Sequence, residues 1–267
     1  MKETFSVIRW TLWQRRWFLL WWCVAVSALI MINLAFYPSF RDQAAQLEQS
    51  LSEIPDSAKA LTTDTGEFAS PVGFLTSQVY YLMLPMLLGI MSITLGSSLL
   101  AREEKEGTIE LLLSRPISRS RLLFGKLISG IILSTVAVGV GGVVTIIMAN
   151  LVDLAVPNEH IAMATLACLI LVICFGAIAF LITCLGKARI ASIGIATLIA
   201  LGGYIVASLA SLADWLKVLS KFFPFYYYKP GDILYGNYHL KNIIILGVVI
   251  AIASTLAYIV FRRRDIA

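Results

Sequence analysis

The chain has 267 residues, of which 59% are hydrophobic and only 14% are charged, and its mean hydropathy is +0.85. A water-soluble core does not require so much apolar surface, so these values exclude an ordinary soluble protein and indicate an integral membrane protein. The formal net charge of +5 does not call for a nucleic-acid partner, because membrane topology explains an excess of basic residues.

Six apolar stretches are long enough to cross a hydrocarbon layer about 30 Å thick, which takes roughly 20 helical residues. Because lipid offers the backbone no hydrogen-bond partners, each stretch must form a helix. The predicted transmembrane helices cover residues 17–37, 79–101, 127–149, 161–185, 190–213 and 243–261. The predicted fold class is an all-α polytopic membrane protein, with the whole chain, residues 1–267, forming one domain.

The basic residues predict the orientation of these helices. With six crossings, both termini lie on the same side as the connections 102–126 and 186–189. That side holds fifteen of the 21 Lys and Arg residues. Because positively charged connections stay in the cytoplasm, we predict cytoplasmic termini and a multi-pass protein of the cytoplasmic (inner) membrane of a bacterium or archaeon.

Residues 1–16 precede the first transmembrane helix and predict a helix of their own. An apolar stripe with basic residues on its flank is typical of a helix that lies at the membrane interface. The stripe consists of Phe5, Ile8 and Leu12. A frayed terminal tail is the alternative.

The segment 38–72 is the larger of the predicted extracytoplasmic segments. Its apolar residues recur at four- and three-residue steps until Pro55, which predicts an amphipathic helix on the outer face of the bundle. These residues are Phe40, Ala44, Leu47, Leu51 and Ile54.

Residues 101–127 concentrate ten charged side chains in an otherwise apolar chain. We predict that the second transmembrane helix continues through residues 102–106 and ends at Gly107, which readily adopts a left-handed conformation. Thr108 is a suitable N-cap for a new short helix, and Glu110 in its first turn suits the positive end of the helix dipole. The connection 102–126 is therefore predicted to form a helical elbow.

The short helix of the elbow has a polar and an apolar side. Pro116 ends it, and Ser118 can cap the helix that leads into the third transmembrane span. Its apolar face, formed by Ile109, Leu112 and Leu113, needs a surface against which to bury. An ordinary solvated loop is the alternative, but topology does not require the four acids of this stretch. We therefore predict that the elbow docks to a cytoplasmic protein.

This stretch resembles the permease subunits of ABC-2 type ABC exporters. Those proteins often carry an acidic cluster followed by Gly-Thr, Glu, a Leu-rich turn, and then Pro and Ser-Arg. The pattern stands here as Glu104, Glu106–Gly107–Thr108, Glu110, Leu111 to Leu113, Pro116 and Ser118–Arg119. The resemblance extends to the N-terminal helix, the six spans and the aromatic, proline-containing segment before the last span.

The resemblance implies a type V exporter-like fold in which residues 102–116 form a coupling helix seated in a cleft of a separate nucleotide-binding subunit. That partner would hold ATP and Mg, and two permease copies, identical or paralogous, would form the transporter. The residues that the resemblance assigns to coupling are Glu103, Glu104, Glu106, Gly107, Thr108, Glu110, Leu112, Leu113, Arg115, Pro116, Ser118 and Arg119.

Small residues within two of the spans predict close helix packing. The glycines of residues 137–144 lie inside the third span, where they are better explained by packing than by nucleotide binding. In the fifth span, Ser192, Ala196 and Ala200 recur at four-residue steps. A seam between two permease copies and packing within one subunit are both open for this stripe.

The predicted extracytoplasmic segment 214–241 is rich in aromatic residues. One interpretation is an aromatic belt at the membrane boundary. The other is a pair of short helices that dip back into the outer leaflet and cap a translocation path. Leu212, Leu216, Leu219 and Phe223 share a helical face that Pro224 would end. The candidate exit residues are Trp215, Phe222, Phe223, Pro224, Phe225, Tyr226, Tyr227 and Tyr228.

The residue types in the spans argue against chemistry in this chain. The predicted spans contain no Asp, Glu, Lys, Arg or His, whereas ion-coupled transporters usually place such groups there. Gly125–Lys126 and Gly186–Lys187 lack the other glycine and the Ser or Thr of a phosphate-binding loop. The four cysteines match no metal-ligand spacing. We therefore predict that the chain is not an enzyme and holds no catalytic residue, metal or cofactor.

Together these features predict the permease subunit of an ATP-driven exporter for an amphipathic or hydrophobic substrate, such as a drug, a peptide antibiotic or a lipid. The alternative is a membrane scaffold or sensor whose elbow docks a cytoplasmic signalling protein. An intramembrane enzyme acting on lipids is disfavoured, because catalytic groups are missing from the spans.

Overall fold

The computed structural model describes residues 2–43, 70–105, 119–186, 189–210 and 214–263 of the chain. Six helical stretches in this part of the chain are long and apolar enough to cross a membrane. They are Arg16–Gln43, Pro71–Leu99, Ser120–Leu151, Asn158–Cys184, Arg189–Ser208 and Leu240–Arg263. The predicted fold class, an all-α polytopic membrane protein with six transmembrane helices, is confirmed.

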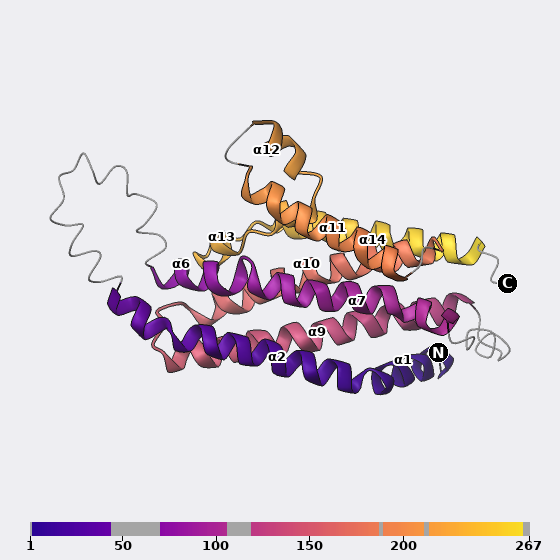
Figure 1. Cartoon of the computed structure of the whole chain (residues 1–267), viewed down its shortest axis with the longest axis horizontal. Coiled ribbons are helices and arrows are strands. Elements are labelled where there is room, and N and C mark those ends of the chain that lie inside the picture. Colours follow the sequence, from indigo (N-terminus) through magenta and orange to yellow (C-terminus); the bar gives the residue numbers. More distant parts are fainter. Residues whose placement is uncertain (1, 44–69, 106–118, 187–188, 211–213, 264–267) are drawn as a thin grey trace.

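The long helices make up most of the bundle (Figure 1). In chain order the elements are α1 (Lys2–Gln14), α2 (Arg16–Ala35), α6 (Pro71–Leu75), the π-helix η1 (Thr76–Tyr80), α7 (Met83–Lys105), α9 (Arg119–Leu151), α10 (Asn158–Cys184), α11 (Arg189–Ser208), α12 (Asp214–Ser220), the 3-10 helix η2 (Pro224–Tyr227), α13 (Pro230–Leu234) and α14 (Leu240–Arg263).

Helix α10 forms the centre of the bundle. It packs against α7, α9, α11 and α14, and its buried side chains include Ile161, Leu171 and Phe175. A helix that is apolar on every side can bury all of its faces, and α10 has the highest mean hydropathy of the six spans, 2.9. Figure 1 shows that α1 begins, α7 ends, α9 begins and α14 ends at the same end of this bundle.

Glycines bring the central helices into close contact. A Cβ atom on Gly96 of α7 would overlap the backbone oxygen of Gly176 on α10. On α9, a Cβ on Gly142 would lie 2.5 Å from Cγ2 of Thr165. Gly142 of the third span therefore serves helix packing, as the sequence predicted, whereas a Cβ at Gly139 would meet nothing within 4 Å.

The small-residue stripe of α11 faces its own subunit. Ser192, Ala196 and Ala200 are buried, and α11 packs against α7 and α10. This finding favours packing within one subunit over the predicted alternative of a seam between two copies. The opposite side of α11 is apolar and exposed, with Ile190 at 85% and Leu198 at 71%.

Four spans differ from their predicted bounds by five or more residues at one end. The first continues to Gln43 instead of residue 37, and the third begins at Ser120 instead of residue 127. The second begins at Pro71, eight residues before the predicted residue 79, because Ser70 caps it by accepting a hydrogen bond of 2.9 Å from the backbone nitrogen of Gly73. The fifth span ends at Ser208 instead of residue 213. Composition did not reveal either of these two ends. Polar residues follow Pro71, which hides the start of the second span, and apolar residues continue beyond Ser208, which hides the end of the fifth.

The predicted N-terminal helix exists as α1, and its position at the membrane interface stays a prediction. Val7 and Thr11 are buried, whereas Phe5 is 67% exposed. Helix α1 packs against α9, and Val7 approaches Gly125 so closely that a Cβ there would lie 2.9 Å from Cγ1 of Val7. The partner helix selects the buried face, and the apolar pattern of α1 did not identify that partner.

Only the start of the predicted outer amphipathic helix lies in the described part of the chain. Residues 37–43 are helical, and the ring of Phe40 lies 4.9 Å from the ring of Phe74 on α6. The predicted positions Ala44, Leu47, Leu51 and Ile54 lie outside the described residues, so the rest of this helix stays a prediction.

Candidate functional site

The predicted coupling elbow lies between the end of α7 and the start of α9. Glu103 and Glu104 belong to α7, which ends at Lys105, and Arg119 is the first residue of α9. The remaining coupling residues lie outside the described part of the chain; they are Glu106, Gly107, Thr108, Glu110, Leu112, Leu113, Arg115, Pro116 and Ser118. Helix α7 ends and helix α9 begins at the end of the bundle where α1 begins and α14 ends (Figure 1).

Two hydrogen bonds link Arg15, the residue between α1 and α2, to α7 a few residues before the elbow. Nη2 of Arg15 donates to Oγ of Ser98 at 2.9 Å and to the Ser98 backbone oxygen at 3.3 Å. Ser98 is buried, and its hydroxyl donates in turn to the backbone oxygen of Leu95 at 3.1 Å. From the sequence, Arg15 counted only as one of the basic residues that predict the orientation of the helices. Nothing in the sequence pairs it with a residue 83 positions away.

We expect Arg15→Gln to weaken this link. A hydrogen bond from a charged group contributes roughly 1.5–3 kcal/mol, so the variant should lose about 1–2 kcal/mol of stability and melt at a lower temperature. Arg16→Gln is the matched control, because the exposed Arg16 guanidinium lies 4.2 Å from the Trp13 ring centroid and contacts no distant helix through that interaction. Thermal unfolding in detergent measures both. Equal losses in the two variants would contradict a specific role for Arg15.

Lys126, predicted to lie in the connection 102–126, is part of α9. Its side chain is only 3% exposed. The third span therefore contains a buried lysine near its start, whereas the prediction from the sequence put every basic residue outside the spans. The reason is that α9 starts at Arg119, so the last residues of the predicted connection, including Lys126, belong to this helix.

The aromatic segment, residues 214–241, forms three short helices between α11 and α14. The prediction of a helix that continues to Pro224 is wrong, because α12 ends at Ser220. Leu212 of the predicted face lies outside the described residues. Pro224 instead begins η2, where the fixed backbone angle of proline suits the first turn. The depth of these short helices in a membrane stays a prediction.

The aromatic side chains divide into an exposed and a buried group. Trp215 and Phe222 are 67% and 81% exposed, which fits a membrane belt, whereas Phe225 and Tyr228 are buried. Phe223, Tyr226 and Tyr227 are half-buried, and Pro224 is buried. The exposed residues suit the predicted aromatic belt, whereas re-entry into the outer leaflet and capping of a translocation path stay predictions.

Tyr228 anchors the aromatic segment to the start of the second span. Its hydroxyl donates to the backbone oxygen of Tyr80 in the π-helix η1 at 2.8 Å. Burial raises the pKa of the Tyr228 phenol well above its usual value, so the hydroxyl keeps the proton that it donates. The hydroxyl of Tyr80 continues the network, at 2.7 Å from Oγ1 of Thr165 on α10. Three separate elements are thereby joined by buried polar contacts.

A second contact holds the same segment on α10. Nδ1 of His160 lies 3.0 Å from the backbone oxygen of Leu234 and donates to it. Gly236 follows with φ +87°, and a Cβ there would lie 3.2 Å from the His160 ring. Glycine fits because the turn requires a left-handed backbone and the imidazole occupies the space. His160 therefore positions the aromatic segment.

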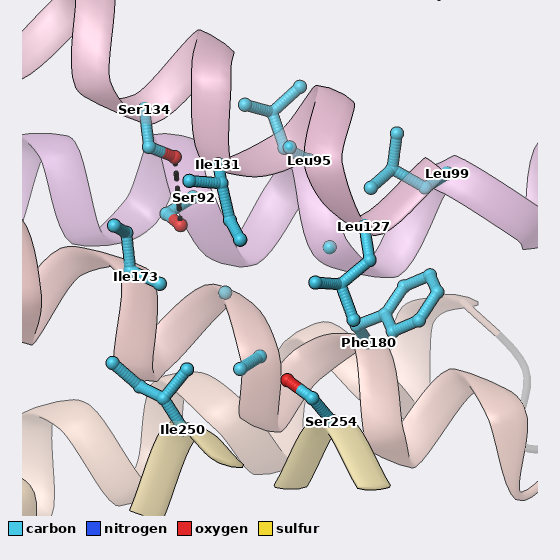
Figure 2. Close-up of a pocket in the computed structure, with 14 residues that line it drawn as sticks. Ser92, Leu95, Leu99, Leu127, Ile131, Ser134, Ile173, Phe180, Ile250 and Ser254 are labelled. Atoms are coloured by element: carbon cyan, nitrogen blue, oxygen red, sulfur yellow. Dashed lines mark hydrogen bonds between the residues drawn. The ribbon is translucent and has the colours of Figure 1, made fainter. Parts of the chain in front are cut away.

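A narrow cavity of about 40 Å³ lies between α7, α9, α10 and α14 (Figure 2). Its walls are mostly apolar and include Leu95 and Phe180. Ser92 and Ser134 lie with their hydroxyls 3.4 Å apart, and Ser254 contributes another hydroxyl from α14. No ionisable group is among the described residues that line it, so the cavity suits a nonpolar group with few hydrogen bonds.

The described residues do not assemble a metal site. Among them, no group of three or more His, Cys, Asp or Glu side chains could hold a metal ion. The four cysteines are free thiols, and the pair formed by His239 and Asp232, 3.1 Å apart, lies on the surface.

Comparison with known proteins places these features in a family. No curated protein matches the chain. The family model described as ABC-2 family transporter protein matches residues 14–266, which covers all six transmembrane helices and the connections between them. The chain therefore belongs to the ABC-2 family of transporter proteins, as a membrane transport component.

Proposed function

We propose that this chain is the permease subunit of an ATP-driven exporter that moves an amphipathic or hydrophobic substrate outward. A separate nucleotide-binding subunit holds ATP and Mg, and two permease copies, identical or paralogous, form the pathway. The observation that carries the proposal is the match to the ABC-2 family over residues 14–266, together with the acidic, Gly-Thr-containing stretch between α7 and α9.

The arrangement of α7 and α9 supports a mechanical role for that stretch. Both helices run the length of the bundle and pack on the central helix α10. In the proposed cycle, ATP draws two nucleotide-binding subunits together and the coupling helices move with them. Because α7 and α10 are in backbone contact at Gly96 and Gly176, a displacement of α7 is passed to the centre of the bundle. ATP thereby biases the permease between closed and open states.

The character of the interior supports the substrate class. The cavity in Figure 2 is mostly apolar, and a second cavity of about 40 Å³ between α7, α10 and α11 has an apolar lining apart from Thr197. Carrying an ion or a sugar through such surroundings would leave polar groups without partners. A hydrophobic or amphipathic molecule avoids that cost.

We expect the combined charge reversals Glu106→Lys and Glu110→Lys to abolish co-purification of the nucleotide-binding subunit from native membranes and to abolish transport-linked ATP hydrolysis. Acids that meet a basic surface become like charges after reversal, so association is lost. Glu159→Lys is the matched control, because Glu159 is exposed in the first turn of α10, at the opposite end of the bundle.

Three outcomes decide the proposal. Loss of the ATPase in the elbow variant alone supports it. Undiminished association and ATP hydrolysis in that variant overturn the coupling role. Recovery of a signalling protein in place of an ATPase from wild-type membranes overturns the transporter function in favour of a scaffold.

A further inference from the structure

An open groove separates the first turns of α9 from the last turns of α14. Its volume is about 460 Å³, and α1 contributes to its rim through Thr4. The groove exists because α14 packs mainly on α10, whereas this part of α9 packs on α1. It lies at the end of the bundle where α9 begins and α14 ends (Figure 1).

The α9 wall of the groove changes from polar to apolar along its length, whereas the α14 wall carries the hydroxyl groups of Ser254, Thr255 and Tyr258. At the end nearest the start of α9 lie Ser120 and Arg121, with Tyr258 from α14 opposite. The Ser120 hydroxyl donates to the Tyr258 hydroxyl at 3.3 Å. Further along α9, the lining consists of Phe124, which is 59% exposed, and Leu127. A polar head followed by an apolar channel is the pattern of an amphipathic ligand.

The groove adjoins the cavity shown in Figure 2. Leu127 and Ser254 line both of them, and the cavity continues along α9 to Ser134. From Ser120 to Ser134 the helix rises by about 21 Å at 1.5 Å per residue. One leaflet contributes about 15 Å of hydrocarbon plus its headgroup layer. The groove and cavity together therefore have the length of one lipid molecule in one leaflet.

The charges at the polar end favour an anion. Arg121 is exposed there, and its guanidinium has the fork of donors that matches phosphate oxygens. Helix α9 begins at Arg119, so the positive end of its dipole lies at the same place. Arg262 and Arg263, in the last turn of α14, lie at the same end of the bundle but do not line the groove. No acid is among the described residues that line the groove.

We propose that this groove binds an anionic phospholipid from the surrounding leaflet. The phosphate contacts Arg121 and the hydroxyl groups of Ser120 and Tyr258. One acyl chain lies along Phe124 and Leu127 and reaches toward Ser254. The lipid fills a space that would otherwise leave apolar side chains facing a gap, and it holds α9 and α14 apart at a set spacing. The inference does not depend on the direction or the substrate of transport.

The test uses the full chain in lipid nanodiscs that contain phosphatidylglycerol with a photoreactive diazirine on one acyl chain. Peptide mapping after illumination reports where the chain lies. We expect labels at Leu127 to Ser134 and around Ser254. Arg121→Gln should lower this labelling about tenfold, because the lipid phosphate loses one charged hydrogen-bonding partner. Leu127→Trp should abolish it by filling the groove.

Matched controls separate the groove from the general lipid-facing surface. Arg9→Gln removes an exposed arginine of α1 that does not line the groove, and Leu198→Trp enlarges an exposed side chain of α11. Both should leave the labelling within about twofold of wild type. Arg121→Lys, which keeps a positive charge, should retain more labelling than Arg121→Gln, and it serves if the glutamine variant does not fold.

Several results would overturn the proposal. Equal labelling by a photoreactive phosphatidylcholine would remove the requirement for an anion. Labels on the exposed face of α11 as dense as those in the groove would mean ordinary surrounding lipid only. A disulfide between cysteines placed at Phe124 in two copies of the chain would mean that a second copy covers the groove. None of these readouts measures ATP hydrolysis or transport, so they are independent of the proposed function.

Discussion

Replacement of Gly96 by valine is expected to separate α7 from α10 and to unfold the centre of the bundle. The new Cβ would overlap the backbone oxygen of Gly176 and would lie 3.2 Å from the backbone nitrogen of Phe180. Because both obstacles are backbone atoms, no change of side-chain rotamer relieves them, and one helix has to move. Overpacking of a close interface costs about 1–3 kcal/mol or more, and the loss of the neighbouring contacts adds to it.

The variant should therefore give little folded protein, and its remaining fraction should melt well below wild type when detergent-solubilised protein is heated and passed over a size-exclusion column. Gly139→Val on α9 is the control, because a Cβ at Gly139 meets nothing within 4 Å. That change should leave yield and melting temperature almost unaltered. A stable Gly96→Val protein would show that α7 and α10 do not need backbone contact.

Replacement of Tyr228 by alanine is expected to release the aromatic segment from the bundle. The side chain is 3% exposed, and truncation of a large buried aromatic residue costs about 3–5 kcal/mol. Its hydroxyl also supplies the 2.8 Å bond to the Tyr80 backbone oxygen. Tyr228→Phe removes only that bond and should cost about 1–3 kcal/mol. The order of the two variants separates the contribution of ring packing from that of the hydrogen bond.

Hydrogen–deuterium exchange over residues 214–239 measures the release, since amides of a detached segment exchange faster. Tyr227→Phe provides the control, because the Tyr227 hydroxyl donates to the backbone oxygen of Lys221 at an exposed position. It should change exchange little. Faster exchange in the control than in Tyr228→Ala, or unchanged exchange in all three variants, would contradict an anchoring role for Tyr228.

Several parts of the candidate site followed from local sequence chemistry. The second helix continues into Glu103 and Glu104, and a helix begins again at Arg119, which agrees with the predicted positions of the two arms of the elbow. The docking face Ile109, Leu112 and Leu113 lies outside the described residues and remains a prediction.

Other parts could not be predicted, because they join distant segments. Arg15 meets Ser98, and Tyr228 meets Tyr80, across 83 and 148 residues. The sequence showed that Tyr228 belongs to an aromatic cluster, but it contained no signal for which aromatic side chains are buried. Trp215 and Phe225 have similar hydrophobicity and opposite exposure. Their difference comes from where α12 and η2 lie against α11 and α10.

The sequence by itself determined the fold class, the number of transmembrane helices and the position of the charged elbow. These properties depend on helix length and on the cost of leaving backbone or charged groups in hydrocarbon, and both can be counted along the chain. Only the tertiary structure decided which face of each helix lies inside. In a membrane protein the lipid-facing side is as apolar as the interior, so hydrophobic periodicity carries little information about burial. That is why the stripe from Ser192 to Ala200 could be placed only once its partners α7 and α10 were known.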